Sequence, residues 1–251
     1  MTTQITTALI TGASSGIGAV YADRLAARGA NLVLVARRED RLKTLAADLR
    51  ARYGVGVDIL VADLTDETGI RAVEEKLRSN TAIDTLINNA GTAQMAPFLA
   101  GDVAQHQAIN TLNTTALMRL TYAILPRLAQ NNRGTLINIA SVLALHVRAG
   151  SALYSATKAW VLSFTRGLQE EFAESNVRIQ AVLPAATATE IWSHSGVTVN
   201  DLPEGSVMTT DDMVDASLAG LDHEKLPGLG LFSELVNTCL SQPGLTTGQL
   251  L

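Results

Sequence analysis

The chain has 251 residues, of which 47% are hydrophobic and 17% charged. This balance excludes a disordered chain, which is poorer in apolar residues and richer in charge. The net charge of −5 offers no broad basic surface, so we expect no nucleic-acid partner, and the single cysteine, Cys239, excludes an internal disulfide framework.

Short β-branched runs alternate with longer amphipathic stretches over most of the chain. The runs have the nearly continuous apolar character of buried parallel strands and cover 6–11, 31–36, 57–62, 85–88, 135–140 and 177–183. Helical patterns lie at 16–29, 38–53, 66–79, 103–130 and 153–174. This βαβ repetition predicts an α/β fold, with a doubly wound Rossmann-type parallel sheet and helices on both faces.

The pattern weakens after the sixth run. Residues 185–210 mix Thr, Ser, Gly and Asn without periodicity, and a helix is predicted at 211–222. A long irregular segment in a compact domain is often a binding loop, so we expect a substrate loop or lid at about 185–222. Residues 228–232 are the best candidate for a seventh strand. Because no Pro/Ser-rich linker divides the sequence, we expect residues 1–251 to form a single domain.

No apolar run reaches the ~18 residues of a membrane span, and the polar start of the chain lacks the features of a signal peptide. We therefore expect a cytoplasmic protein without a membrane partner. The four histidines are scattered and no spacing of metal-binding residue types is convincing, so we expect no metal.

A glycine-rich turn follows the first predicted strand and runs into a helix. Its candidate phosphate-binding residues are Gly12, Ser14, Ser15, Gly16, Ile17 and Gly18. Glycines let backbone amides approach a pyrophosphate, and a helix N-terminus favours an anion. The alternative is a β-to-α turn without a ligand, but the strand–turn–helix context favours a nucleotide site.

A second pattern joins Ser141, at the end of the fifth strand, to Tyr154 and Lys158 on the helix predicted at 153–174. Tyr154 and Lys158 are i and i+4 neighbours on one helical face, so the ammonium is expected near the phenol. A nearby positive charge lowers the pKa of a phenol, which makes Tyr154 a candidate for proton transfer. Alone, such a pair is more often a half-buried aromatic beside a solvated charge.

Four motifs occur together in one order: the Gly-xxx-Gly-x-Gly turn, Asn88-Asn89-Ala90-Gly91, Ser141 and Tyr154-xxx-Lys158. In this combination the chain resembles the short-chain dehydrogenase/reductase family from residue 6 to about residue 190. The resemblance implies that Tyr154 is the acid/base, that Lys158 holds the nicotinamide ribose and lowers the pKa of Tyr154, and that Ser141 hydrogen-bonds the substrate oxygen.

The resemblance implies further contacts. The family's catalytic asparagine is expected at Asn110, with Asn113 as the nearby alternative, and it would help to hold a water beside Lys158. The expected cofactor contacts beyond the glycine turn are Asp63, Leu64, Asn89, Ala90, Gly91 and Pro184. Many relatives have Pro-Gly where this chain has Pro184-Ala185, so both Thr187 and Thr189 stay open for the nicotinamide amide, and Thr189 has the better spacing.

Cofactor preference is indicated at the end of the second strand. NAD-preferring sites carry an acid about 20 residues beyond the glycine turn, but here Ala36 is followed by Arg37 and Arg38. Space and a guanidinium suit a 2′-phosphate, so NADP(H) is the predicted cofactor. The alternative is that both arginines only pair with acids on the surface.

The sequence thus predicts an NADPH-dependent carbonyl reductase or alcohol dehydrogenase acting on a small or medium organic substrate. Two alternatives stay open: a cofactor-binding regulatory protein without catalysis, and an epimerase or dehydratase. A homodimer or homotetramer is expected, with a dimer built on the helices at 110–130 and 153–174. The sequence does not identify the substrate, its stereochemistry or the direction of the reaction.

Overall fold

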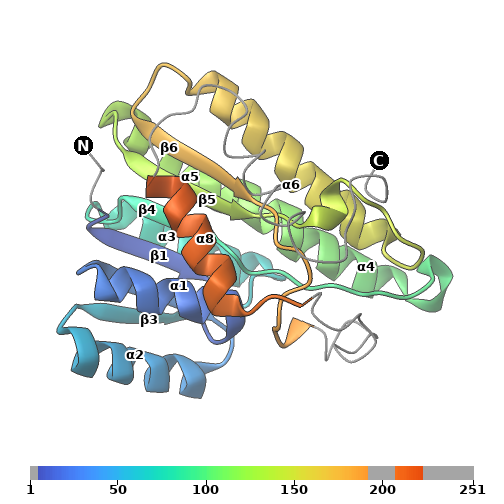
Figure 1. The fold of residues 1–251 in the computed structure, drawn as a ribbon, viewed down its shortest axis with the longest axis horizontal. Helices are drawn as coiled ribbons and strands as arrows, with labels where there is room; N and C mark the ends of the chain where they lie inside the picture. Colours follow the sequence, from blue (N-terminus) through green and yellow to red (C-terminus); the bar gives the residue numbers. More distant parts are fainter. Residues whose placement is uncertain (1–4, 192–206, 223–251) are drawn as a thin grey trace.

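The computed structural model describes residues 5–191 and 207–222 (Figure 1). Its six strands form one parallel sheet in the order β3-β2-β1-β4-β5-β6. The strands are β1 Thr7–Thr11, β2 Asn31–Ala36, β3 Val57–Val61, β4 Thr85–Asn88, β5 Gly134–Ile139 and β6 Val177–Val182. The predicted α/β fold with a doubly wound parallel sheet is confirmed. The expected seventh strand at 228–232 lies outside the described residues.

Helices cover both faces of the sheet (Figure 1). They are α1 Gly16–Ala27, α2 Glu39–Tyr53, α3 Glu67–Ser79, α4 Val103–Asn110, α5 Leu117–Gln130, α6 Ala152–Glu171 and α8 Thr210–Asp222. Apolar residues of α1, α2 and α8 pack in one buried cluster, and those of α3, α5 and α6 pack in another on the opposite face. The strands are apolar on both sides because each face is covered.

The stretch predicted as one helix at 103–130 is divided. A π-helical segment, η2 Thr111–Ala116, joins α4 to α5. Single π-helical turns change the hydrogen-bond register of a helix and are frequent at functional sites. Two short 3₁₀ turns, η1 Phe98–Ala100 and η3 Val142–Ala144, lie in the connections that follow β4 and β5.

A series of buried side-chain hydrogen bonds links the central strands β4 and β5 to helices α5 and α6. Asn88 and Asn138 are register partners on β4 and β5, and the Asn88 side chain donates to Asn138 (3.0 Å) and to Thr121 (3.1 Å). Asn138 in turn donates to Thr165 of α6 at 3.0 Å. Buried amides are tolerated when their partners are supplied, and here they fix the position of α6 on the sheet.

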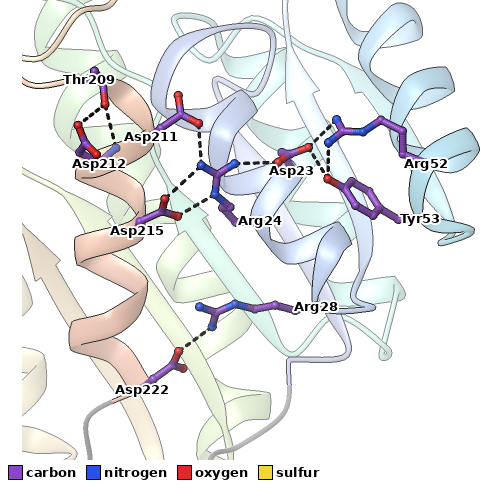
Figure 2. A network of polar contacts seen from close by, with 10 residues as sticks. All are labelled: Asp23, Arg24, Arg28, Arg52, Tyr53, Thr209, Asp211, Asp212, Asp215 and Asp222. Atoms are coloured by element: carbon purple, nitrogen blue, oxygen red, sulfur yellow. Dashed lines mark hydrogen bonds and ion pairs between the residues drawn. The ribbon is translucent and has the colours of Figure 1, made fainter.

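The helix that follows the irregular segment is anchored on α1. Figure 2 shows Arg24 between Asp211 and Asp215 of α8, each at 2.7 Å, and Arg28 paired with Asp222 at 2.8 Å. Of the substrate loop expected at about 185–222, residues 185–191 and 207–222 are described. Backbone hydrogen bonds from Ala188 to Met208 and from Met208 to Ala186, each 2.9 Å, bring the two described ends together.

Candidate active site

The sheet reverses its winding between β1 and β4, and in open α/β sheets ligands bind at the carboxyl ends of the strands at such a point. The glycine turn follows β1 there, and Asn89, Ala90 and Gly91 follow β4. Thr11 joins the two segments, because its hydroxyl accepts hydrogen bonds from the amides of Asn89 and Ala90, each at 3.0 Å. The Asn89 side chain donates back to the Thr11 carbonyl at 2.8 Å.

Two glycines of the turn are required by close packing. A Cβ on Gly12 would lie 2.8 Å from the Asn89 amide nitrogen, and a Cβ on Gly18 would lie 2.5 Å from the Gly12 carbonyl oxygen. Helix α1 starts here, and within the described chain no side chain caps its N-terminus at Ser15. An uncapped helix N-terminus beside a tight glycine turn fits the pyrophosphate of a dinucleotide.

The polar residues at the end of β2 face the same turn. Arg38 donates to the hydroxyls of Ser14 (2.8 Å) and Ser15 (2.7 Å), whereas Arg37 is exposed and lies 3.7 Å from Asp63. Guanidinium and hydroxyl donors gathered at this position fit a 2′-phosphate. Arg41 of α2, which the sequence reasoning missed, belongs to this cluster through Glu190, a residue that pairs with both Arg38 and Arg41.

Asp63 and Leu64 follow β3 at the same end of the sheet. Leu64 is buried. Burial raises the pKa of the Asp63 carboxyl, but hydrogen bonds from the Thr65 amide and hydroxyl, together with the nearby Arg37 guanidinium, outweigh it and hold that pKa below its usual value. Asp63 is therefore an ionised acceptor at neutral pH.

Ser141, Tyr154 and Lys158 come together after β5, and all three are buried. The Ser141 side chain is the polar group that interacts with the Tyr154 phenol. The Lys158 ammonium lies 5.7 Å from the centroid of the Tyr154 ring and donates to the Ile139 carbonyl at 2.8 Å. The structure thus joins a phenol, a hydroxyl and an ammonium at the carboxyl end of the central strands.

The pKa values in this group are set by burial. Burial raises the pKa of Tyr154 to about 12, and the hydrogen bond with Ser141 offsets only part of that effect. Burial also lowers the pKa of Lys158 to about 8. Burial thus acts against the lowering of the Tyr154 pKa that the family resemblance implies for Lys158, and that role of Lys158 stays a prediction.

The structure places Asn113, not Asn110, beside this group. Asn113 is 1% exposed, and its amide donates to the Thr157 hydroxyl (3.0 Å) and the Thr92 carbonyl (2.9 Å) while its oxygen accepts from the Thr92 amide (3.0 Å). A Cβ on Gly91 would lie 3.3 Å from the Asn113 oxygen and 3.5 Å from the Lys158 nitrogen. Asn110 is exposed, so the position expected for Asn110 is corrected to Asn113.

The segment after β6 reaches the glycine turn. Pro184 and Thr187 are buried, and Thr187 donates to the Ala185 carbonyl at 3.0 Å. A Cβ on Gly16 would lie 3.4 Å from the Thr189 methyl group, so Thr189 covers the start of α1. Of the two threonines, Thr189 is the one that the structure brings to the cofactor turn.

Two other features bear on the predicted partners. Among residues 5–191 and 207–222, no cluster of three or more His, Cys, Asp or Glu side chains has the geometry to hold a metal ion. No helix in the described part of the chain combines the length and apolarity needed to cross a membrane.

Comparison with known proteins agrees with this site. A family model described as short chain dehydrogenase matches residues 6–199, and the chain belongs to this family of oxidoreductases. A short-chain dehydrogenase from Sphingobium yanoikuyae, solved in complex with NADPH, is 47% identical, with a TM-score of 0.86, and the alignment covers 93% of each chain. The predicted family is confirmed.

Two further relatives mark the range of the family. The bulky-bulky ketone specific alcohol dehydrogenase from Comamonas testosteroni is 42% identical, with a TM-score of 0.81 and coverage of 94% of this chain and 92% of its own. The inactive hydroxysteroid dehydrogenase-like protein 1 of Homo sapiens is 30% identical, and the alignment covers 75% of this chain but 58% of that protein. The family thus includes both active and inactive members.

Proposed function

We propose that the chain is an NADP(H)-dependent carbonyl reductase and alcohol dehydrogenase. The observation that carries the proposal is the burial of Ser141, Tyr154 and Lys158 together at the carboxyl end of the sheet, where the Lys158 ammonium lies 5.7 Å from the centroid of the Tyr154 ring. A phenol held there against a hydroxyl is suited to exchange a proton with a substrate oxygen.

Tyr154, Ser141 and Lys158 each have a separate role in the reduction. When bound, the reduced nicotinamide supplies the hydride that reduces the carbonyl carbon. The Tyr154 phenol is protonated at neutral pH, since its pKa is about 12, and it donates that proton to the substrate oxygen. Ser141 hydrogen-bonds the same oxygen as negative charge develops on it, and the ammonium of Lys158 stabilises the phenolate that remains. Solvent then reprotonates Tyr154.

Preference for NADP(H) is supported by the arginines at the end of β2. Ala36 leaves space where an acid would repel a phosphate, and Arg38 is already held against the Ser14 and Ser15 hydroxyls. The NADPH complex of the relative from Sphingobium yanoikuyae supports the same preference.

We propose an apolar ketone or aldehyde as the substrate. Large apolar side chains are exposed in the two connections that follow β4 and β5: Phe98, Leu99, Leu145 and Val147. The two connections meet, since a Cβ on Gly150 would lie 3.4 Å from the Ala96 amide nitrogen. The relative from Comamonas testosteroni, named for bulky ketones, supports the same class.

The test is a panel of ketones, aldehydes and alcohols followed at the NADPH absorbance band. Tyr154→Phe should lower turnover by about 10²-fold or more and leave NADPH binding unchanged, because it removes the acidic hydroxyl group and keeps the ring. Tyr122→Phe, an exposed tyrosine of α5, is the matched control and should keep full turnover. Near-normal turnover by Tyr154→Phe would overturn the acid/base assignment.

The human inactive relative favours one alternative, a cofactor-binding protein without catalysis. The alternative predicts NADPH binding without turnover across the whole panel. The same preparations test assembly: we propose a homodimer, because the apolar side chains of Met118 on α5 and Trp160 on α6 are exposed.

A further inference from the structure

Five side chains form a charged cluster at the mouth of the glycine turn: Ser14, Ser15, Arg38, Arg41 and Glu190. Arg38 donates one nitrogen to Glu190 at 2.6 Å and another to Ser14 and Ser15. Arg41 donates to the second oxygen of the same carboxylate. A single anion, contributed by the segment after β6, therefore lies between two guanidiniums of the β2–α2 region.

Two guanidinium groups and two hydroxyl groups are the kinds of donor that bind a phosphate monoester. Arginine binds carboxylate and phosphate with the same planar geometry, and hydroxyl groups add neutral donors. Hydrogen bonds from Arg41 and then Arg38 hold the pKa of Glu190 at about 2, so the carboxylate is ionised at every pH at which the protein would work. Glu190 thus presents a permanent negative charge to these donors.

The ion pairs of Glu190 with Arg38 and Arg41 are exposed enough for a competing anion to replace the carboxylate. The side chains of Arg38, Arg41 and Glu190 are 42%, 49% and 45% exposed. Pairs this exposed contribute little to stability, and a dianionic phosphate competes well for the same donors. The segment that carries Glu190 also carries Thr189, which covers Gly16.

We propose that Glu190 is an internal competitor for the 2′-phosphate of NADP(H). The inference rests on the proposed function and adds a residue that sets cofactor affinity. Binding of the 2′-phosphate displaces Glu190 from Arg38 and Arg41, so it also releases the segment that carries Thr189 from its position over the turn. NAD(H) has no 2′-phosphate and leaves the ion pairs in place.

The test is isothermal titration calorimetry of the full chain with NADP⁺, NAD⁺, adenosine 2′,5′-bisphosphate and 5′-AMP. Glu190→Gln should tighten binding of NADP⁺ and of the bisphosphate by about threefold to tenfold, because each lost ion pair no longer competes. The dissociation constants for NAD⁺ and 5′-AMP should stay within about twofold. Glu174→Gln, which removes the same charge at an exposed site beyond α6, should change none of the four.

Several results would overturn the inference. Unchanged or weaker NADP⁺ binding by Glu190→Gln would show that Glu190 does not compete, and equal tightening of NADP⁺ and NAD⁺ would show that the phosphate is not involved. Tightening of NADP⁺ without tightening of the bisphosphate would place the effect at Thr189 instead of the arginines. Failure of the wild-type chain to bind either dinucleotide would overturn the proposed function as well, which distinguishes the two failures.

Discussion

Asn113 and Asn110 form a natural pair for mutation, because they lie three residues apart and differ in burial. Asn113→Ala removes three hydrogen bonds of 2.9–3.0 Å and leaves the Thr92 amide and the Thr157 hydroxyl without those partners. At about 1 kcal/mol for each bond, the free energy of unfolding should fall by about 3 kcal/mol. For a chain of this size, that loss lowers Tm by about 6–12 °C.

The same substitution should reduce turnover. Thr157 bonds both the Asn113 amide and the Tyr154 carbonyl, so Asn113 helps to hold the part of α6 that carries the acid/base. We expect kcat to fall by about tenfold or more, because small displacements of a catalytic group are costly. Asn110→Ala changes an exposed helical residue, so it should alter stability by less than about 0.5 kcal/mol and leave kcat unchanged.

Thermal unfolding followed by circular dichroism and steady-state rates with the best carbonyl substrate measure both effects. Equal losses in the two variants, or a larger loss for Asn110→Ala, would refute the assignment of Asn113. An unchanged Tm in Asn113→Ala would refute the hydrogen bonds on which the magnitude rests.

Two further predictions concern the buried ammonium and the anchoring of α8. Burial lowers the pKa of Lys158 to about 8, whereas in the unfolded chain that pKa is about 10.5. Between these two pH values the unfolded chain binds more protons than the folded one, so the stability of the wild type rises with pH. Lys158→Met has no such titration. From pH 8 to pH 10, urea unfolding should show the free energy of unfolding of the wild type rising by about 2 kcal/mol relative to that of the variant. An equal difference in free energy between the two proteins at both pH values would contradict the pKa shift. Arg24→Gln removes the pairs with Asp211 and Asp215 in Figure 2. Because these pairs are partly exposed, the free energy of unfolding should fall by about 1 kcal/mol or less. Amide hydrogen exchange in α8 of the variant should be faster than in the wild type at low salt, and the two rates should converge at high salt, where the pairs are screened. Equal exchange rates at low salt would show that the pairs do not anchor the helix.

The strands were predictable because their signal is local. A strand buried on both faces needs a continuous apolar run, and each end of the six runs predicted from the sequence agrees with the observed strands to within one residue. The glycine turn was equally clear, since Gly12 and Gly18 are the positions where a side chain would collide with Asn89 or with the turn itself. In both cases the residue type follows directly from the space available.

The asparagine was not predictable from helical periodicity. In an uninterrupted α-helix, residues three apart share a face, so Asn110 and Asn113 have nearly equal claims. The π-helical segment η2 changes the hydrogen-bond register between them, and the outcome is one exposed and one buried side chain. Glu190 was missed for another reason: its partners Arg38 and Arg41 are far away in sequence, and an ion pair between distant residues has no periodic signature.

The pKa of Tyr154 shows how burial alters an argument made from spacing alone. The i, i+4 spacing places Lys158 near the phenol, but the ammonium is directed to the Ile139 carbonyl, and both groups have lost most of their hydration. Each is therefore driven toward its neutral form: the phenol keeps its proton up to about pH 12, and the ammonium keeps its proton only up to about pH 8. Near pH 7 the site holds a protonated phenol beside a protonated amine. That state donates a proton to a developing alkoxide without prior ionisation, whereas removal of a proton from an alcohol first requires the phenolate. The protonation state of the site thus favours carbonyl reduction at neutral pH, and the rate of alcohol oxidation should increase as the pH rises.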